Sequence, residues 1–296
     1  MLTLEAILVG LIMGVSYGLM AFGLTLIFGI LKVVYFAHGE SFMIGAFTYS
    51  LLALWLGMPL WLAIPSAILV GGLVGVVVER LLIRPLYEKF ADWQAMRDEY
   101  AIIVTFGLSL FLVNLANQVF GPYPFRGPEL TDVARFQLGP LIIGGHRLVA
   151  GAVGVVVLGA AYLFVQHSFW GKQIRAVAQN RFGASIAGID TRMVSMLMFS
   201  LAGGLAALSG ALLAPLFHAS PDVGVLPALK SFVIVVLGGM GSPIGSLVGG
   251  LILGVLESLG ALYISYTYRD TYAFVILIMV LLLRPQGLFG ERAREV

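Results

Sequence analysis

The chain has 296 residues, of which 60% are hydrophobic and only 11% are charged, and its mean hydropathy is +1.01. Soluble domains carry about 25% charged residues, so this composition excludes a water-soluble fold and indicates a lipid environment. The net charge of +2 says little by itself, and the lack of cysteine excludes disulfides, thiolate catalysis and cysteine-ligated metals.

The hydropathy pattern predicts up to nine membrane spans, because a spanning helix needs about 20 mostly apolar residues. We expect an all-α polytopic integral membrane protein with eight to nine transmembrane helices, folded as a single domain over residues 1–296. The first span is too long for a signal-peptide core and lacks a basic leader, so it is expected to be retained. The seventh is short enough to be re-entrant. The predicted spans are 6–31, 36–56, 60–83, 100–120, 148–166, 194–217, 226–239, 243–264 and 271–284.

Lysine and arginine set the orientation, because cytoplasmic loops carry an excess of them. With the N-terminus outside and the C-terminus in the cytoplasm, 12 of the 17 basic residues face the cytoplasm. Nine crossings satisfy this arrangement, and eight would need a re-entrant seventh segment and another shifted boundary. The five residues left outside are Arg126, Arg135, Arg147, Lys230 and Arg269.

The connection 121–147 is the longest external one, and glycine and proline interrupt it at Gly121–Pro124 and Gly127–Pro128. These residues end helices rather than extend them, so we expect a small external cap. The cytoplasmic connection 84–99 carries charges of both signs and is expected to be a solvated link.

The cytoplasmic segment 167–192 is the most informative part of the chain. Its basic residues face a single acid, Asp190, and apolar residues recur at helical spacing at Ile174, Val177 and Ala178. This pattern is typical of a short surface helix that docks on a cytosolic partner. On charge alone, a positive-inside loop that only fixes the topology is the simpler interpretation. The basic residues are Lys172, Arg175, Arg181 and Arg192.

A parallel internal repeat is suggested by two similar span endings, Leu81–Pro85 and Leu281–Pro285. A glycine-containing break begins the span before each of them, at His38–Gly45 and at Gly238–Gly245. Transporters often contain repeats in which broken helices mark the solute pathway. A chance match over five positions is the alternative.

Glu257 and Glu40 are the unusual acids of the sequence. Glu257 follows a glycine-rich run at membrane depth, where a carboxylate is costly unless it is paired, protonated or facing water. It is therefore a functional candidate, and a structural hydrogen bond to a neighbouring helix is the alternative. Glu40, after His38 and Gly39, either caps or pairs a helix start or lies on a pathway.

The sequence has no phosphate-binding loop, no H-E-x-x-H zinc motif and no G-x-S-x-G nucleophile motif, so an enzyme is not expected. Its four histidines have no metal-ligand spacing, so we expect this chain to bind no metal or cofactor. If ATP drives transport, another chain must bind the ATP and its Mg²⁺.

Three blocks of sequence, spread over nearly the whole chain, share their order and spacing with a known family. They are Phe36–Ala46, then Gly171–Asn180 with Gly188–Asp190, then Gly238–Gly245 with Glu257 and Arg284–Gly290. Together they resemble the permease subunits of the branched-chain amino-acid ABC importers. The His-Gly-Glu block and the chain length resemble the shorter of the two permease types.

The resemblance implies a permease of the bacterial inner membrane that takes up branched-chain or related amino acids from an external binding protein by alternating access. Implied partners are a second, different permease chain, two cytosolic ATP-binding subunits and the binding protein, with lipid around them and no nucleic acid. ATP and Mg²⁺ would bind to the partner subunits.

The resemblance also favours docking as the role of the segment 167–192. It implies ATPase coupling by Gly171, Lys172, Arg175, Ala176, Asn180, Arg181, Gly188 and Asp190. Arg181 and the following Phe182-Gly183 carry less weight, because the family varies more there. Together with the helix breaks, it gives as pathway candidates His38, Gly39, Glu40, Gly241, Ser242 and Glu257.

An ion-coupled secondary transporter or channel for urea, an amide or an amino acid is the alternative function, which Glu40 and Glu257 leave open. The docking segment argues against it. Substrate choice is expected to lie largely in the external binding protein, because related permeases are thought to serve urea, short amides and aromatic acids as well.

Overall fold

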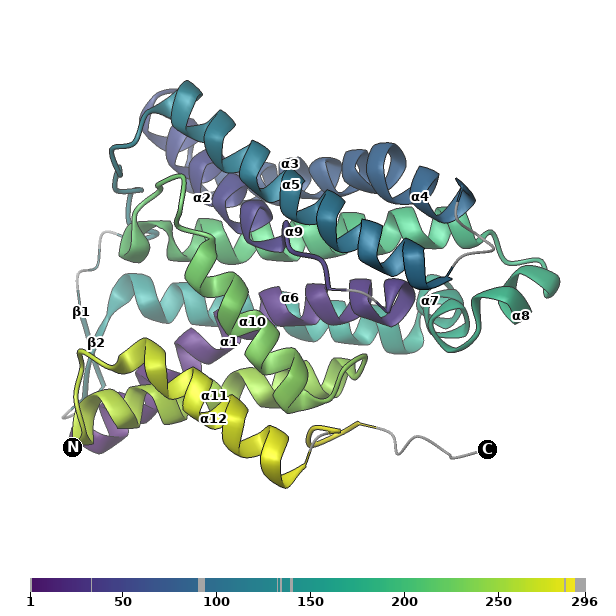
Figure 1. Cartoon of the computed structure of the whole chain (residues 1–296). Coiled ribbons are helices and arrows are strands. Elements are labelled where there is room, and N and C mark those ends of the chain that lie inside the picture. The colour runs from purple at the N-terminus through teal and green to yellow at the C-terminus, as the bar shows by residue number, and fades with distance from the viewer. Residues whose placement is uncertain are drawn as a thin grey trace.

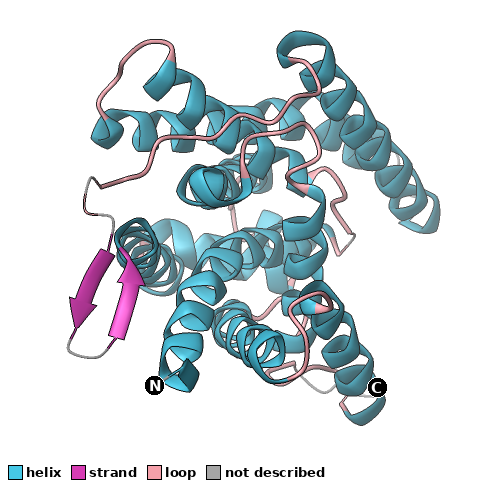
Figure 2. Cartoon of the chain, turned by 90° about the vertical axis from the view of Figure 1, so that its left-hand side faces the viewer, coloured by secondary structure: helices cyan, strands magenta, loops and turns pink. Residues whose placement is uncertain are grey.

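The protein is a helical bundle with one small β-hairpin at its edge (Figures 1 and 2). The computed structural model describes residues 2–32, 34–89, 94–131, 133, 135–138, 141–284 and 286–290. Arg292 and Arg294, which contribute to the predicted orientation, and Pro285 of the second repeat motif lie outside the described residues.

The helices fall into long apolar helices, shorter apolar helices and two short helices in the segment 167–192. The long helices are α1 (Leu2–Leu31), α3 (Leu60–Val78), α5 (Gln94–Phe120), α6 (Gly145–His167), α9 (Thr191–Phe217) and α11 (Pro243–Tyr263). The shorter ones are α2 (His38–Leu54), α10 (Val225–Gly238) and α12 (Arg269–Leu283). The segment between α6 and α9 forms α7 (Phe169–Gln179) and α8 (Arg181–Ile186). A π-helical turn (Glu79–Ile83) and α4 (Arg84–Lys89) continue α3, and the hairpin consists of β1 (Arg135–Leu138) and β2 (Leu141–Gly144).

Six of the helices in the described residues are long and apolar enough to cross a membrane. The other three predicted spans correspond to α2, α10 and α12, which have 17, 14 and 15 residues. At 1.5 Å per residue α10 is only about 21 Å long, shorter than a hydrocarbon core of about 30 Å. The number of crossings therefore remains a prediction. The short segments that the sequence predicts are present as α2, α10 and α12.

The connection after α5 differs from the predicted one in its bounds and its content. Helix α6 begins at Gly145, three residues before the predicted span, and the connection contains the antiparallel pair β1–β2, with Arg135 opposite Gly144. The expectation of an all-α chain is wrong at this one place. In the connection 84–99, residues 84–89 and the residues from Gln94 onward are helical, so the predicted solvated link is largely helix.

Specific contacts hold the connection between α5 and α6 as a cap on the bundle. Phe125 forms a backbone bridge with Ala219, beyond the end of α9. The Tyr49 hydroxyl donates to the Pro128 carbonyl over 2.8 Å. The Nδ1 atom of His146 accepts from the Leu130 amide at 3.2 Å, which leaves its Nε2–H to donate to a carbonyl of α9 at 3.0 Å. The connection is therefore packed onto the bundle, and its place outside the membrane stays a prediction.

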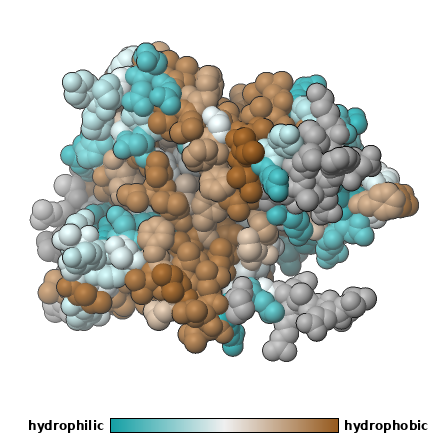
Figure 3. All heavy atoms as spheres, viewed as in Figure 1, coloured by the Kyte–Doolittle hydropathy of each residue, from teal (hydrophilic) through white to brown (hydrophobic). Residues whose placement is uncertain are grey.

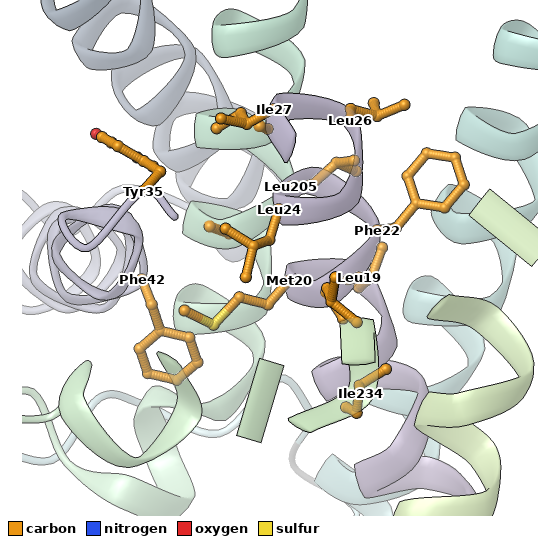
Figure 4. Close-up of a cluster of buried hydrophobic side chains, with 14 of the residues drawn as sticks. Leu19, Met20, Phe22, Leu24, Leu26, Ile27, Tyr35, Phe42, Leu205 and Ile234 are labelled. Carbon is orange, nitrogen blue, oxygen red and sulfur yellow. The ribbon is translucent and has the colours of Figure 1, made fainter. Parts of the chain in front are cut away.

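Helices α1 and α9 form the centre of the bundle. In their most apolar 18-residue windows, 72% and 78% of the residues are buried, against 11% for α5. Figure 4 shows side chains leaving α1 in several directions, among them Leu19, Met20 and Phe22, and all three are fully buried. A helix that is hydrophobic all round belongs in the interior of a membrane bundle, because no face of it needs water.

Glycines allow these central helices to approach their neighbours closely. A Cβ atom on Gly254 of α11 would lie 2.2 Å from the Gly10 carbonyl oxygen of α1. A Cβ atom on Gly75 of α3 would lie 2.1 Å from the Phe199 carbonyl oxygen of α9. Small residues are the usual solution in lipid, where helices associate through close backbone packing.

These contacts relate α1–α3 to α9–α11 rather than to α10–α12. Each set is a long helix, a short helix and a second long helix, and the long helix of each set packs against the last helix of the other. The predicted parallel repeat would equate the 30-residue α1 with the 14-residue α10. That repeat is not confirmed by the packing.

The two short helices α2 and α10 begin beside one another. A Cβ atom on Gly224, which caps α10, would lie 2.0 Å from the Gly39 carbonyl oxygen, and one on Gly39 would lie 2.7 Å from the Gly224 carbonyl oxygen. His38 fixes this start, because its Nε2 atom contacts the Met20 carbonyl of α1 at 2.9 Å. The start of α2 therefore lies inside the bundle, whereas Val225 and Leu226 at the start of α10 are about half exposed.

On the face shown in Figure 3, apolar side chains cover most of the middle of the molecule and polar side chains gather toward its ends. Aromatic side chains gather where α2, α3 and α11 meet their loops: Trp55, Trp61, Tyr263 and Tyr266 are all strongly exposed. Tryptophan and tyrosine are enriched where the bilayer meets water, so these side chains indicate a membrane boundary at this end of the bundle.

We expect Gly45→Ala to destabilise the fold. The added Cβ would lie 2.0 Å from the Ala207 carbonyl oxygen, so α2 and α9 would have to separate, at a cost of about 1–3 kcal/mol. The matched control is Gly107→Ala on α5, where nothing lies within 4 Å of the added atom. Thermal unfolding of both variants in detergent tests this, and equal melting temperatures would contradict the packing.

Candidate functional site

The segment 167–192 contains two short helices, and a side-chain N-cap begins each of them and the helix that follows. Ser168 Oγ accepts from the Gly171 amide at 2.8 Å and caps α7. Asn180 Oδ1 accepts from the Gly183 amide at 2.8 Å and caps α8. Asp190 Oδ1 accepts from the amides of Arg192 and Met193, the second and third residues of α9, at 3.0 and 3.1 Å. The predicted surface helix is therefore present, and side-chain oxygens fix where each helix begins.

Several predicted coupling residues shape this segment. Gly171 follows the turn out of α6 so closely that a Cβ atom would lie 2.2 Å from the Val165 carbonyl oxygen. Arg175 donates through Nη1 to the Gln166 carbonyl at 2.9 Å, and to the Val165 carbonyl. Gly188 has a φ of +84° at the end of α8, a backbone conformation that favours glycine. Arg175 is thus a positioning residue that holds α7 against the end of α6.

The remaining predicted coupling residues differ in exposure. Lys172 is exposed, whereas Ala176 is half-buried on α7 beside the buried Ile174 and Val177. Arg181 is half-buried and begins α8. The basic side of α7 therefore faces outward while its apolar side packs against the bundle, as an amphipathic helix requires.

The exposed end of this segment is an apolar surface, which the sequence analysis did not identify as a functional site. Phe182 and Ile186 lie one turn apart on α8 and are 74% and 73% exposed. Helix α8 projects beyond the rest of the bundle (Figure 1), and apolar spheres lie at that tip in Figure 3. The i, i+4 spacing of these two residues after the Asn180 cap was the available signal. Together Phe182 and Ile186 are called the α8 tip below.

An exposed ion pair joins this end of the bundle to α4. Arg192, the second residue of α9, lies 3.0 Å from Glu88. A few residues before α4, the buried Glu79 lies 3.1 Å from Arg84. The start of α9 is thus tied to α4, which continues α3, as well as to α8.

A second site is a network of charges buried between four helices. Lys230 Nζ of α10 lies 2.6 Å from Glu257 Oε1 of α11 and 2.7 Å from Asp270 Oδ1 of α12. Arg269 Nε lies 2.8 Å from the same Glu257 oxygen. The Lys230 ammonium also donates to the Tyr17 hydroxyl of α1 at 3.4 Å. These five residues are called the charge network below.

The charge network shows the contacts of Glu257. It also shows that the predicted external position of Lys230 is wrong. Glu257 is completely buried, and two cations face it, so the interhelical pairing considered from the sequence is what the structure shows. Lys230, counted among the external residues, is only 4% exposed and lies inside the bundle. Hydropathy could not reveal this, because the partners are 27 residues apart and on different helices.

Glu40 pairs across helices in a similar way. Its Oε1 atom accepts from the Ser109 hydroxyl of α5 at 2.6 Å, and its Oε2 atom is buried with no hydrogen-bond partner among the described residues. This contact agrees with the interhelical pairing considered for Glu40, and its role on a pathway stays a prediction. His38 and Gly39 hold the start of α2, as described above.

Gly241 and Ser242 build the turn between α10 and α11. Gly241 has a φ of +88°, and Ser242 Oγ accepts from the Gly245 amide at 3.1 Å. The chain after α12 returns to this turn: the Leu288 amide donates to the Leu237 carbonyl at 2.8 Å. The two parts of the third sequence block are therefore neighbours in space. Whether any pathway candidate touches a solute stays a prediction.

Within the residues that the structure describes, no group of histidine, aspartate and glutamate side chains is arranged to hold a metal ion.

Comparison with known proteins identifies the family of this chain. Residues 6–283 match the family described as branched-chain amino acid transport system / permease component. The chain belongs to this family. It is 32% identical to the high-affinity branched-chain amino acid transport system permease protein LivH of Escherichia coli K12, over 95% of the chain and 94% of the relative. It is 32% identical to BraD of Pseudomonas aeruginosa, the permease protein of the same named system, over 97% and 96%.

A more distant relative is the ribose import permease protein RbsC of Escherichia coli K12, which is 33% identical over 44% of the chain and 43% of the relative. No solved structure matches. The relatives are transport subunits, which agrees with the expectation that this chain is not an ATPase.

Glu257→Gln should destabilise the protein strongly. It leaves Lys230 and Arg269 beside a neutral amide in a buried site, and removing one partner of a buried pair costs about 3–5 kcal/mol. The double variant Glu257→Leu with Arg269→Leu removes one charge of each sign and keeps the Lys230–Asp270 pair, so most of the stability should return.

The control for this experiment is Glu129→Gln, which breaks the exposed pair with Arg126 and should change the unfolding free energy by less than about 1 kcal/mol. Chemical unfolding in detergent gives all three values. A Glu257→Gln protein as stable as Glu129→Gln would show that the buried network contributes little.

Proposed function

We propose that this chain is a membrane permease subunit of an ATP-driven importer for branched-chain or related amino acids. The α8 tip carries the proposal: two large apolar side chains stand exposed on a rigidly capped helix, in a segment with exposed basic residues. Family membership supports the same role. The substrate class follows the relatives named above, whose system transports branched-chain amino acids.

The proposed assembly has this chain and a second permease chain in the membrane, two ATP-binding subunits at the α8 tip and a solute-binding protein on the opposite side. ATP and Mg²⁺ bind only to the partner subunits. ATP binding and the loaded binding protein stabilise different states of the permease pair, and this difference drives alternating access. In this role Gly171, Arg175, Asn180, Gly188 and Asp190 position the docking helices, while Lys172 and the α8 tip meet the partner.

The ion-coupled alternative is less well supported by the contacts. A carboxylate that carries an ion through the membrane must exchange that ion, and Glu257 is already held by Lys230 and Arg269. Glu40 is the remaining acid at membrane depth among the pathway candidates, and Ser109 occupies one of its oxygens.

The orientation can be tested directly, because the chain has no cysteine. We propose an inner-membrane location with the N-terminus outside and the C-terminus in the cytoplasm. Single cysteines at the exposed positions Ser185 on α8 and Tyr123 in the cap then report opposite sides. In intact spheroplasts a membrane-impermeant maleimide should label Tyr123→Cys alone, and after lysis it should label both. Labelling of Ser185→Cys in intact spheroplasts would invert the topology.

Phe182→Glu should separate the permease from its ATP-binding subunit. An exposed phenylalanine that docks in a partner pocket is a typical binding hot spot worth 2 kcal/mol or more, so co-purification should fall about tenfold or more. Tyr123→Glu is the matched control, since it places the same charge on an exposed aromatic residue in the cap. Mass spectrometry of the material that co-elutes with each tagged variant gives the result.

Unchanged recovery of the ATP-binding subunit with Phe182→Glu would contradict docking at the α8 tip. Recovery of the wild-type chain alone, together with solute uptake into vesicles without ATP, would overturn the importer proposal itself.

A further inference from the structure

A cavity of about 450 Å³ opens beside the charge network. Its walls come from the end of α9, the turn that follows it, the first two turns of α10, and the start of α12 with the loop before it. This is the end of the bundle that carries the exposed tyrosines, opposite the α8 tip (Figure 1). The volume is within the roughly 300–1,000 Å³ typical of small-molecule sites.

One wall of the cavity is cationic. Arg269 lines it and pairs with Glu257 through its Nε atom, and its side chain also interacts with Tyr266. A guanidinium has five N–H donors, so donors remain for a ligand. Lys230 lines the same wall, but its ammonium is already shared among Glu257, Asp270 and Tyr17. Arg269 is therefore the group best able to receive a carboxylate, since guanidinium binds carboxylates in a two-pronged geometry.

The opposite charge is supplied by two carboxylates, Asp222 and Asp270, which line the same cavity. Asp222 is exposed, and its Oδ1 atom accepts from the Ser220 hydroxyl at 2.7 Å. The Asp270 side chain is half exposed, with one oxygen directed to Lys230. Each carboxylate keeps capacity to accept from an ammonium group, because an ionised carboxylate has about four lone-pair sites.

The rest of the lining is apolar. Phe217, Val223, Leu226 and Pro227 belong to the end of α9, the turn after it and the start of α10. Leu226 is half exposed at this surface. A cavity with two cationic groups, of which Arg269 has fewer partners, two anionic groups and an apolar wall is chemically complementary to a zwitterion that has an apolar side chain.

We propose that this cavity binds a free α-amino acid with an aliphatic side chain. The ligand carboxylate binds Arg269, its ammonium binds Asp222 and Asp270, and its side chain packs against Phe217 and Leu226. The choice of an amino acid rests on the proposed function, whereas the site itself rests on the cavity and its charges. The permease thus holds its substrate at the outer end of the bundle rather than only enclosing a passage.

The test uses the full-length chain in lipid nanodiscs, without an ATP-binding subunit or a binding protein. Equilibrium binding of ³H-labelled L-leucine is measured, and unlabelled analogues compete. L-Leucine should displace the label, whereas 4-methylpentanoate, which lacks the ammonium, and L-leucinol, which lacks the carboxylate, should need about tenfold higher concentrations or more. A charge-assisted hydrogen bond of 1.5–3 kcal/mol sets that factor.

Two variants at the mouth of the cavity test whether leucine binds there. Asp222→Asn removes one anionic partner and should raise the dissociation constant about tenfold. Leu226→Trp should fill the cavity and abolish binding. Both positions are exposed, so the fold should tolerate the changes. Glu129→Gln removes an exposed acid in the cap, outside the cavity lining, and should leave leucine binding unchanged.

The outcomes separate this proposal from the importer role. No saturable leucine binding, or binding that neither mouth variant weakens, overturns the cavity proposal even if the ATP-binding subunit co-purifies. Leucine binding that Asp222→Asn and Leu226→Trp weaken supports the site, whether or not an ATP-binding subunit is found. Displacement by 4-methylpentanoate as effective as by L-leucine would overturn the assignment of the ammonium partners.

Discussion

The close approach of helix backbones at glycine is the constraint on which the rest of this structure depends. Lipid gives helices no hydrophobic reason to associate, so they must gain contacts by packing backbone against backbone. The pairs Gly10–Gly254 and Gly75–Phe199 show this contact on both central helices. Because α1 packs on α11 while α9 packs on α3, the first and last thirds of the chain interlock. Separating the two thirds would therefore expose the helix surfaces that each buries against the other.

The same solvent explains the charge network. A lone carboxylate at the depth of Glu257 would be costly in lipid, and two cations and a tyrosine surround it instead. A buried ion pair often adds no stability over apolar residues of the same size, so packing alone gives no reason for these charges. Their position supplies one: Lys230, Arg269 and Asp270 form a wall of the outer cavity. The proposed site for a zwitterion requires charged side chains in fixed positions. In lipid such charges are stable only when other charged or polar groups pair with them.

Local signals in the sequence were enough to find the six long apolar helices, but not the long-range pairing of side chains. Apolar runs predict membrane helices because lipid leaves the backbone no other option. Asn180 and Asp190 fit a helical segment because a side-chain oxygen satisfies free amides at a helix start. No local pattern shows that Lys230 meets Glu257, or that Arg175 bonds to the end of α6. Such contacts depend on the packing of whole helices, which a single sequence does not display.

Helix α9 connects the two sites in one rigid element. It begins at the Asp190 cap directly after α8 and ends at Phe217 in the cavity wall, a distance of about 40 Å for its 27 residues. A buried helix moves as a body, because its neighbours are packed to it along its whole length. Docking at the α8 tip and filling of the cavity therefore act on the same helix. By linkage, if a partner at the α8 tip favours one position of α9, a ligand in the cavity that favours the same position must strengthen that partner's binding equally.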